Sequence, residues 1–188
     1  MIKTLVVSRE VDYDGSQLAS LWALRNFNVQ GDSIVAFTGA CNVDLPSLVD
    51  VRDYLDNAPI YSPRMLHFIV EHFTNDLDRT ILCQRLLIAI IKDIVGGRGA
   101  TGLERMGDDL YVRNRKLSVS IATVTPVSTM IHTGLNIDTE GVLVPAIGLP
   151  ELGWPDSDTP LLAEQVCAAY AREMASVRMA RCKVRGVR

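Results

Sequence analysis

The hydrophobic pattern of this chain changes from helical to alternating near residue 100, and this change constrains the fold more than any other feature. The alternating part predicts four consecutive β-strands, at 101–106, 109–113, 116–125 and 129–138. A tight hairpin turn is predicted at Asn114-Arg115, between the second and third of these strands. A sheet is therefore expected to form the centre of the fold.

Helical patterns dominate on either side of these strands. Ser16 is expected to cap a helix that ends at Phe27, and Ser62-Pro63 supplies the cap and the first-turn proline of another. The predicted helices are 16–27, 45–55, 62–73, 78–96 and 159–177, and two further strands are predicted at 2–8 and 33–41. We therefore predict an α+β fold, with a mixed or antiparallel central sheet and helices packed on one side.

A chain of 188 residues has room for one ordinary domain, which we place at 1–177, followed by a basic tail at 178–188. The tail holds five basic residues and no acid, and since the whole chain carries −3, the rest carries −8. Such a tail could contact nucleic acid or end the chain as a terminal strand or frayed segment with solvated arginines. The ordinary overall charge of the chain offers no general attraction to nucleic acid, which is therefore not expected as a partner.

Cysteine spacing and hydropathy indicate the redox state of the thiols and whether a membrane is involved. The four cysteines, Cys41, Cys83, Cys167 and Cys182, form no CxxC pair. This spacing favours reduced thiols and a cytoplasmic location over a disulfide framework or a zinc site. The longest apolar block, 81–95, is interrupted by charged residues, so no membrane is expected as a partner.

Strand alternation gives Lys116 a possible function. Successive side chains of a strand point to opposite faces, so Lys116 is expected to share a face with Ser118, Ser120 and Ala122. The apolar residues Leu117, Val119 and Ile121 would pack against helices on the other face. The lysine side chain could then lie over an accessible sheet surface of small residues, or it could simply be exposed to solvent.

The next strand carries a second ionisable group. His132 is expected to share a face with Met130, Gly134 and Asn136. If this face adjoins the Lys116 face, a cation and an imidazole converge on one concave surface, as is typical of ligand sites. The alternative is that both faces meet solvent.

The stretch around Lys116 resembles known proteins. "DDLYVRNRKLSVS" is similar to the motif of the biotin and lipoate protein ligase superfamily, whose fold is that of class II synthetases. "RKLSVSIATVTPVSTMIHTGLNID" resembles the octanoyltransferase branch, in which a lysine strand precedes a histidine-glycine strand and a proline-cysteine-glycine loop. The matching positions are Lys116, His132, Gly134, Leu135, Asn136 and the loop 145–148. The segments "REVDYDGS" and "GDSIVAFTGACNV" resemble more specifically the domain of unknown function 366 family.

The superfamily resemblance implies binding of a small carboxylic acid, its adenylate or its acyl thioester. Lys116 would contact the carbonyl and phosphate oxygens as charge develops, and Asp109 would position the lysine or a magnesium ion. ATP with magnesium is the cofactor that a ligase-like reaction would need. An acyl-acceptor protein is then a further partner.

The chain also departs from the superfamily pattern. Asp108 stands where the ligases have asparagine, Val119 stands where a glycine is usual, and Ala146 replaces the transferase cysteine. Gly39 is the one glycine of "FTGACN", where the ligases have a glycine-rich run. These differences weaken the case for the standard ATP-dependent ligation and for the standard cysteine-dependent transfer.

Cys41 and His132 are the candidates for chemistry besides Lys116. In the layout that the resemblance implies, Gly39, Cys41 and Asn42 border an acyl pocket, so Cys41 could be a relocated nucleophile or a buried structural cysteine. His132 could be a general base, a group that orients a ligand carbonyl, or a hydrogen-bonded strand residue. No metal site is expected, since His67 and His72 are five apart on a predicted helix.

Two functions of different class follow. In the first the protein is an enzyme that handles acyl groups or adenylates, with Lys116, His132 and Cys41 as catalytic residues. In the second it is a non-catalytic protein that binds a small carboxylate or a nucleotide. The expected ligand-binding residues in either case are Asp108, Asp109, Ser118, Ser120, Gly39, Asn42, Gly134 and Asn136.

Overall fold

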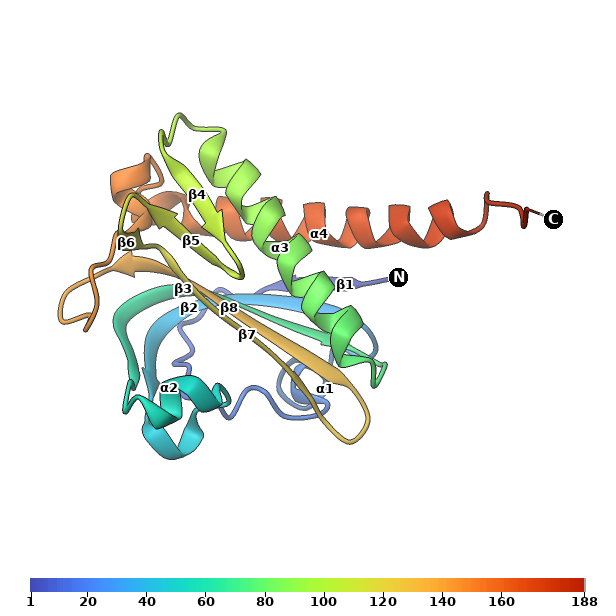
Figure 1. The fold of residues 1–188 in the computed structure, drawn as a ribbon, viewed down its shortest axis with the longest axis horizontal. Helices are drawn as coiled ribbons and strands as arrows, with labels where there is room; N and C mark the ends of the chain where they lie inside the picture. The colour runs from blue at the N-terminus through green and yellow to red at the C-terminus, as the bar shows by residue number, and fades with distance from the viewer. Residues whose placement is uncertain (188) are drawn as a thin grey trace.

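The computed structural model describes residues 1–187, and a five-stranded mixed sheet forms its centre (Figure 1). In spatial order the strands are β1 (Lys3–Val6), β2 (Ser33–Val43), β3 (Ile60–His72), β8 (Thr129–Asp138) and β7 (Ser118–Val124). β1 runs parallel to β2, and every other pair of neighbours is antiparallel. A smaller sheet contains β4 (Leu103–Met106), β5 (Asp109–Val112) and β6 (Arg115–Lys116).

The two long helices cover one face of the large sheet, and the short helices lie on the other side (Figure 1). The long pair is α3 (Leu77–Gly96) and α4 (Thr159–Arg181), and the short pair is α1 (Trp22–Phe27) and α2 (Val51–Leu55). Short 3₁₀ turns occur at Leu45–Ser47, Leu149–Leu152 and Asp156–Asp158. The predicted α+β class with a mixed sheet is therefore confirmed.

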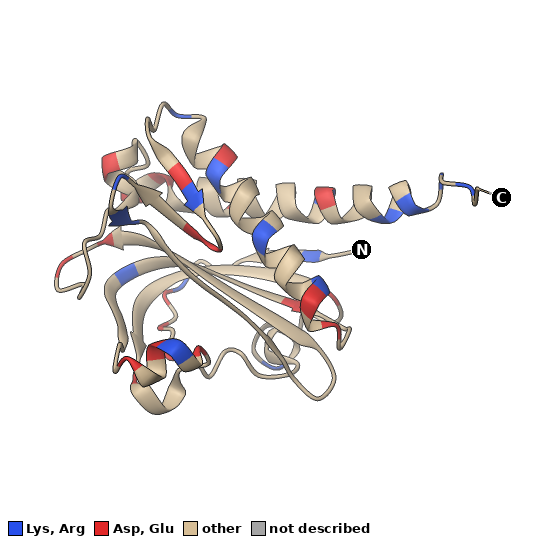
Figure 2. Ribbon diagram, in the orientation of Figure 1, with Lys and Arg blue, Asp and Glu red and all other residues tan. Residues whose placement is uncertain are grey.

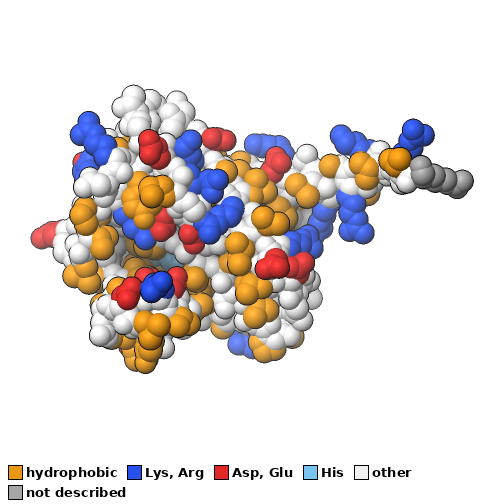
Figure 3. Space-filling model, in the orientation of Figure 1, with side chains coloured by type: hydrophobic (Ala, Val, Ile, Leu, Met, Phe, Trp, Pro, Cys, Tyr) orange, Lys and Arg blue, Asp and Glu red, His pale blue; other side chains and the backbone are white. Residues whose placement is uncertain are grey.

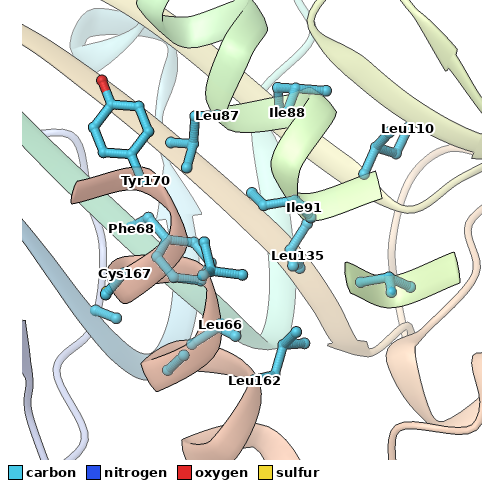
Figure 4. Close-up of a cluster of buried hydrophobic side chains, with 14 of the residues drawn as sticks. Leu66, Phe68, Leu87, Ile88, Ile91, Leu110, Leu135, Leu162, Cys167 and Tyr170 are labelled. Carbon is cyan, nitrogen blue, oxygen red and sulfur yellow. The ribbon is translucent and has the colours of Figure 1, made fainter. Parts of the chain in front are cut away.

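The main core lies between the sheet and the long helices. Phe68 of β3 packs there with Leu87 and Ile91 of α3 and with Cys167 and Tyr170 of α4 (Figure 4). Burying each large apolar side chain of this kind contributes about 1.5–3 kcal/mol. A second apolar cluster occupies the opposite face of the sheet and includes Tyr13, Cys41 and Met65. Both faces of the central strands are thus buried.

This double burial explains why the predicted helix at 62–73 was wrong. Leu66, Phe68 and Val70 belong to the main core, whereas Met65 and Ile69 belong to the second cluster. A strand that is apolar on both faces loses its alternating pattern and resembles a buried helix. Pro63 is tolerated because the registers shift beside it, between Gly39 and Cys41 on β2 and between Arg64 and Met65 within β3.

The predicted helix at 16–27 was also wrong over most of its length. The side chain of Asp14 accepts hydrogen bonds from the backbone N–H and the hydroxyl of Ser16, at 2.9 and 2.6 Å. Ser16 is therefore held in a turn of the kind that competes with helix formation, and it does not act as a cap. Helix α1 begins only after Leu21, which has a left-handed φ of 64°.

Several boundaries moved by a few residues. The hairpin turn lies at Arg113-Asn114, one residue earlier than predicted, because Arg113 takes the left-handed conformation with φ 57°. Helix α4 continues to Arg181, so the first residues of the predicted tail are helical rather than part of a terminal strand. Arg178 and Arg181 lie in the last turn of α4, and this end of the helix extends beyond the body of the protein (Figures 1 and 2). Within residues 1–187, no helix combines the length and apolarity needed to cross a membrane.

Candidate functional site

A cavity of about 270 Å³ lies on the face of the sheet opposite the long helices. Its walls come from β2, β3, β7 and β8, from the segment that contains α2, and from residues 142–144. The space-filling view shows this face hollowed next to α2, with acidic side chains on either side of the opening (Figure 3). Most of the wall is apolar, and Lys116 and His132 are both part of it. The predicted convergence of a cation and an imidazole is therefore found in the structure.

Lys116 forms an ion pair at the edge of the cavity. Its Nζ lies 2.7 Å from Oδ2 of Asp109, and the two side chains are only 29% and 17% exposed. Burial alone would lower the pKa of the lysine, but the Asp109 carboxylate, together with Tyr111 and Asp53, outweighs burial and the pKa is raised. Burial also raises the pKa of Asp109, and the nearby ammonium offsets only part of this change. Lys116 is thus a fixed cation at neutral pH.

The backbone of Lys116 is held by a neighbouring loop and strand. Its N–H donates to the carbonyl of Pro145 at 2.8 Å, and its carbonyl accepts from the N–H of Ile147 at 3.0 Å. The same carbonyl accepts from Nδ2 of Asn136 at 3.1 Å. Lys116 and Ala146 consequently form a short parallel bridge. The loop 145–148, which resembles the transferase cysteine loop, is placed directly beside the lysine.

The predicted side-chain alternation fails at one residue. Leu117 falls between β6 and β7 and is buried in the main core, so Lys116 points to the cavity side. Val119 nevertheless packs with the second cluster and lines the cavity, whereas Ala122 packs against the main core. The irregular residue between the two strands has reversed the alternation. Lys116 therefore shares its side with Val119 and Ile121, and not with the small residues of β7.

Two histidines meet behind the cavity wall. Nδ1 of His67, on β3, lies 3.1 Å from Nε2 of His132, on β8, and Nε2 of His67 lies 3.2 Å from the carbonyl of Gly39. The ring of Tyr13 stacks on His132 with a centroid separation of 3.6 Å and an interplanar angle of 11°. Phe37 stacks on His67 at 5.1 Å. The two imidazoles are thus enclosed between aromatic rings.

Burial keeps both imidazoles neutral. It lowers the pKa of His67 to about 4, although the Gly39 carbonyl opposes the change. Burial and the neighbouring His67 hold the pKa of His132 well below its usual value. A neutral imidazole has one N–H donor and one acceptor nitrogen, so the pair can exchange or direct hydrogen bonds without carrying charge.

Cys41 lines the cavity but has the environment of a structural cysteine. It is fully buried, and burial raises the pKa of its thiol to about 12. A nucleophilic cysteine needs a lowered pKa and access to solvent. The geometry consequently favours the structural alternative for Cys41 over a relocated nucleophile.

The other expected site residues divide into two groups. Asp108, Asp109, Ser120 and Asn136 border the cavity. Asp108 is held by α3, because it accepts from Arg85 at 3.0 Å and from Gln84 at 3.1 Å. Gln84 also donates to the Ser120 hydroxyl at 2.9 Å. These hydrogen bonds from α3 hold Asp108 and Ser120 in place at the edge of the cavity.

The remaining four residues do not line the cavity. They are Ser118, Gly39, Gly134 and Asn42. Ser118 is buried and its hydroxyl accepts from the N–H of Leu110 at 2.8 Å, so it supports the strand that carries Asp109. A Cβ at Gly39 would lie 2.1 Å from the carbonyl oxygen of Val11, which confirms the predicted bulge and close approach. Asn42 borders a separate shallow hollow near Asp14.

Many residues that line the cavity were not expected there, among them Tyr13, Asp53 and Met65. Tyr13 stands between two aspartates, and its N–H donates to the Ala40 carbonyl at 2.8 Å, alongside β2. His67 was also missed, because it was assigned to a helix together with His72. On strand β3 the two face opposite sides, and His72 Nε2 lies 2.8 Å from the hydroxyl of Tyr170.

Four aspartates line the cavity, and two of them are held in ion pairs. Asp108 is paired with Arg85, and Asp109 is paired with Lys116. Across residues 1–187, no group of three or more His, Cys, Asp or Glu side chains is arranged to hold a metal ion. Such a site would need several oxygen ligands free of other cations.

Comparison with known proteins was consistent with the fold and the motif. Residues 2–185 match the domain of unknown function DUF366. An uncharacterised protein of Methanocaldococcus jannaschii is 38% identical over 176 residues, which are 90% of this chain and 78% of that protein. A solved protein of unknown function from Pyrococcus horikoshi is 43% identical, with full coverage of both chains and a TM-score of 0.93.

A more distant likeness extends to ligases. The biotin protein ligase of Aquifex aeolicus, in complex with biotin and ATP, matches at a TM-score of 0.55 and 11% identity. The match covers 90% of this chain and 71% of the ligase. The fold is therefore that of the biotin and lipoate protein ligases, as the resemblance of the Lys116 stretch implied.

Proposed function

This chain belongs to the DUF366 family, and we propose that its cavity binds a small carboxylic acid, or the adenylate or acyl ester of one. Lys116 is the cation that contacts the carboxyl or phosphate oxygens of this ligand. The observation that carries the proposal is a partly buried ammonium at the edge of a mostly apolar cavity. An acid with a hydrocarbon body matches both parts of this surface.

The ion pair with Asp109 suits such a ligand. The Asp109 carboxylate occupies one side of the ammonium at 2.7 Å, and a lysine ammonium has three N–H donors. Two donors therefore remain for ligand oxygens, and Asp109 keeps the lysine oriented before the ligand arrives. A cation in a partly desolvated cavity interacts more strongly with developing negative charge than it would in water.

The likeness to ligases supports this class of ligand. The Aquifex protein of the same fold is a biotin protein ligase solved with biotin and ATP. Biotin is a carboxylic acid, and ATP supplies the phosphate oxygens of an adenylate. Lys116 also stands in the stretch that resembles the ligase lysine motif.

A non-catalytic binding protein is the second candidate, and two residues favour it. Ala146 stands beside Lys116 at the position that resembles the transferase cysteine, and a methyl group cannot form an acyl thioester. Cys41 is buried with a raised pKa. A catalytic function would therefore require direct attack on the bound acyl group by an external acceptor, such as a protein amine.

A thermal-shift screen tests the proposal. The panel contains ATP, biotin, lipoate, octanoate, acyl-CoA and nucleobases, each tested with wild type, Lys116→Ala and Lys3→Ala. Lys3 is exposed on β1 and serves as the matched control. We expect a carboxylate to raise the Tm of wild type and of Lys3→Ala, with a much smaller shift in Lys116→Ala.

The outcomes separate the candidate functions. No shift with any compound would contradict the proposal. Nucleotide binding without release of pyrophosphate on addition of acids would favour the binding protein over a ligase.

A further inference from the structure

The hydrogen bonds of the histidine pair fix which nitrogen carries each proton. The Gly39 carbonyl can only accept, so Nε2 of His67 must carry the proton of that neutral ring. Nδ1 of His67 is then an acceptor, and Nε2 of His132 must donate to it across 3.1 Å. Since a neutral imidazole has only one proton, Nδ1 of His132 is an acceptor with a free lone pair.

This acceptor belongs to the cavity wall and is held rigidly. His132 is 3% exposed and lines the cavity, and its Nε2 is already bonded to His67. Nδ1 is therefore the nitrogen with which His132 can meet a ligand. A flip of the ring would break the hydrogen bond to His67, and a smaller rotation would disturb the stacking on Tyr13. The acceptor cannot easily become a donor.

Lys116 and His132 lie apart along the wall of the same cavity. The Lys116 carbonyl is bonded to Asn136, which lies four positions beyond His132 on the same strand. Four residues of β-strand span about 13 Å. Met65, Val119 and Ile121 are among the apolar side chains that line the cavity with them. The cavity thus offers a cation, an apolar wall and a neutral acceptor.

We propose that the ligand carries an O–H or N–H donor remote from its carboxyl group, and that Nδ1 of His132 accepts a hydrogen bond from this donor. The inference rests on the proposed function, because it assumes that the carboxyl end lies at Lys116. A ligand with a plain hydrocarbon end would leave the buried nitrogen without a partner, which weakens binding. The ligand class is therefore a hydroxy acid or an acid with an amide or ring N–H group.

Calorimetric titration with matched acids tests the inference. 8-Hydroxyoctanoate and 8-methoxyoctanoate share a carboxyl group and a chain, but only the first has a terminal donor. Both acids are titrated as homologues of about six to ten carbons, so that one chain length matches the length of the cavity. We expect the hydroxy acid to bind about tenfold more tightly than the methoxy acid at the best length.

Two variants show whether the preference comes from His132. His132→Phe should abolish the difference between the two acids. His72→Phe changes a buried histidine on the opposite face of the sheet and should keep the difference. Equal affinities of the two acids for wild type would overturn the inference but leave the proposed function intact. Failure of every acid to bind would overturn both.

Nitrogen NMR of the native protein tests the same inference without any variant. We expect protons on Nε2 of both His67 and His132, with Nδ1 of each unprotonated. A proton on Nδ1 of His132 would overturn the inference, even if the variants failed to fold.

Discussion

Ala146 pairs with Lys116 in a short parallel bridge, so the residue at the position that resembles the transferase cysteine lies next to the candidate cation. The bridge consists of the hydrogen bonds from the Lys116 N–H to Pro145 and from the Ile147 N–H to Lys116. Both flank Ala146 and fix its position. The backbone of Ala146 is thus fixed beside the residue that carries the candidate cation.

A cysteine introduced at Ala146 should therefore be activated by its neighbour. Ala146 is partly exposed, so a thiol at this position is accessible to reagents. A cation that lowers the thiol pKa by about one unit raises the thiolate fraction about tenfold. Ala146→Cys should react with iodoacetamide rapidly near neutral pH, and adding Lys116→Ala should slow the reaction. An alkylation rate independent of Lys116 would contradict this relationship.

Cys41 should behave in the opposite way. Its pKa is raised to about 12 by burial, and Cys182 is exposed. Only about one Cys41 in 10⁵ is then ionised at pH 7. In native protein, iodoacetamide should label Cys182 first, and Cys41 should react only after unfolding, as peptide mass spectrometry can measure. Equally fast labelling of the two would restore Cys41 as a candidate nucleophile.

Substitution at Gly39 should disturb both the fold and the cavity. A Cβ there would lie 2.1 Å from the carbonyl oxygen of Val11, two residues before Tyr13. The backbone must move, and Tyr13 would lose its stacking on His132. We expect Gly39→Ala to lower the free energy of unfolding by about 2–4 kcal/mol. Gly96→Ala, at an open position at the end of α3, is the control in urea titrations and should be close to neutral.

Acid should destabilise the protein through the histidine pair. The folded-state pKa of His67, about 4, lies below the ordinary value of 6.5. Between these values the unfolded chain binds protons that the folded protein does not, so stability falls as the pH falls. The loss between pH 7 and pH 5 is about 2 kcal/mol for His67. Below about pH 4 the folded protein also takes up the proton, and no further loss arises from His67.

Urea unfolding and NMR titration check this prediction together. The imidazole signals of His67 and His132 should show neutral rings at pH 5, while the free energy of unfolding declines from pH 7 to pH 5. Titration of either ring near pH 6.5 in the folded protein would show that the pair is not buried as described.

Much of the fold could be predicted from the sequence, and the failures share a physical cause. Strands β4, β5, β7 and β8 were predicted because local alternation and turn residues define them, whereas β6 was not separated from β7. β3 was missed because both of its faces are buried, so its pattern has no period of two. This error also hid His67, whose meeting with His132 depends on the pairing of two strands far apart in the chain.

The candidate site was predictable only in part, for a similar reason. Lys116, Asp109, His132 and Asn136 were expected in the cavity, and each of them borders it. Val119 was expected on the opposite side from Lys116, and the irregularity at Leu117 reversed this arrangement. A single residue outside a regular strand changes the direction of every side chain after it.

Calorimetric titration of acids against their primary amides tests the central claim most directly. Biotin, lipoate and octanoate are each compared with the corresponding amide, in wild type and in Lys116→Met. If Lys116 binds the carboxylate, the best acid should bind wild type at least about tenfold more tightly than its amide, and the variant should not distinguish them. Equal affinity of acid and amide for wild type, or an unchanged preference in Lys116→Met, would contradict the assignment of Lys116 as the ligand-binding cation.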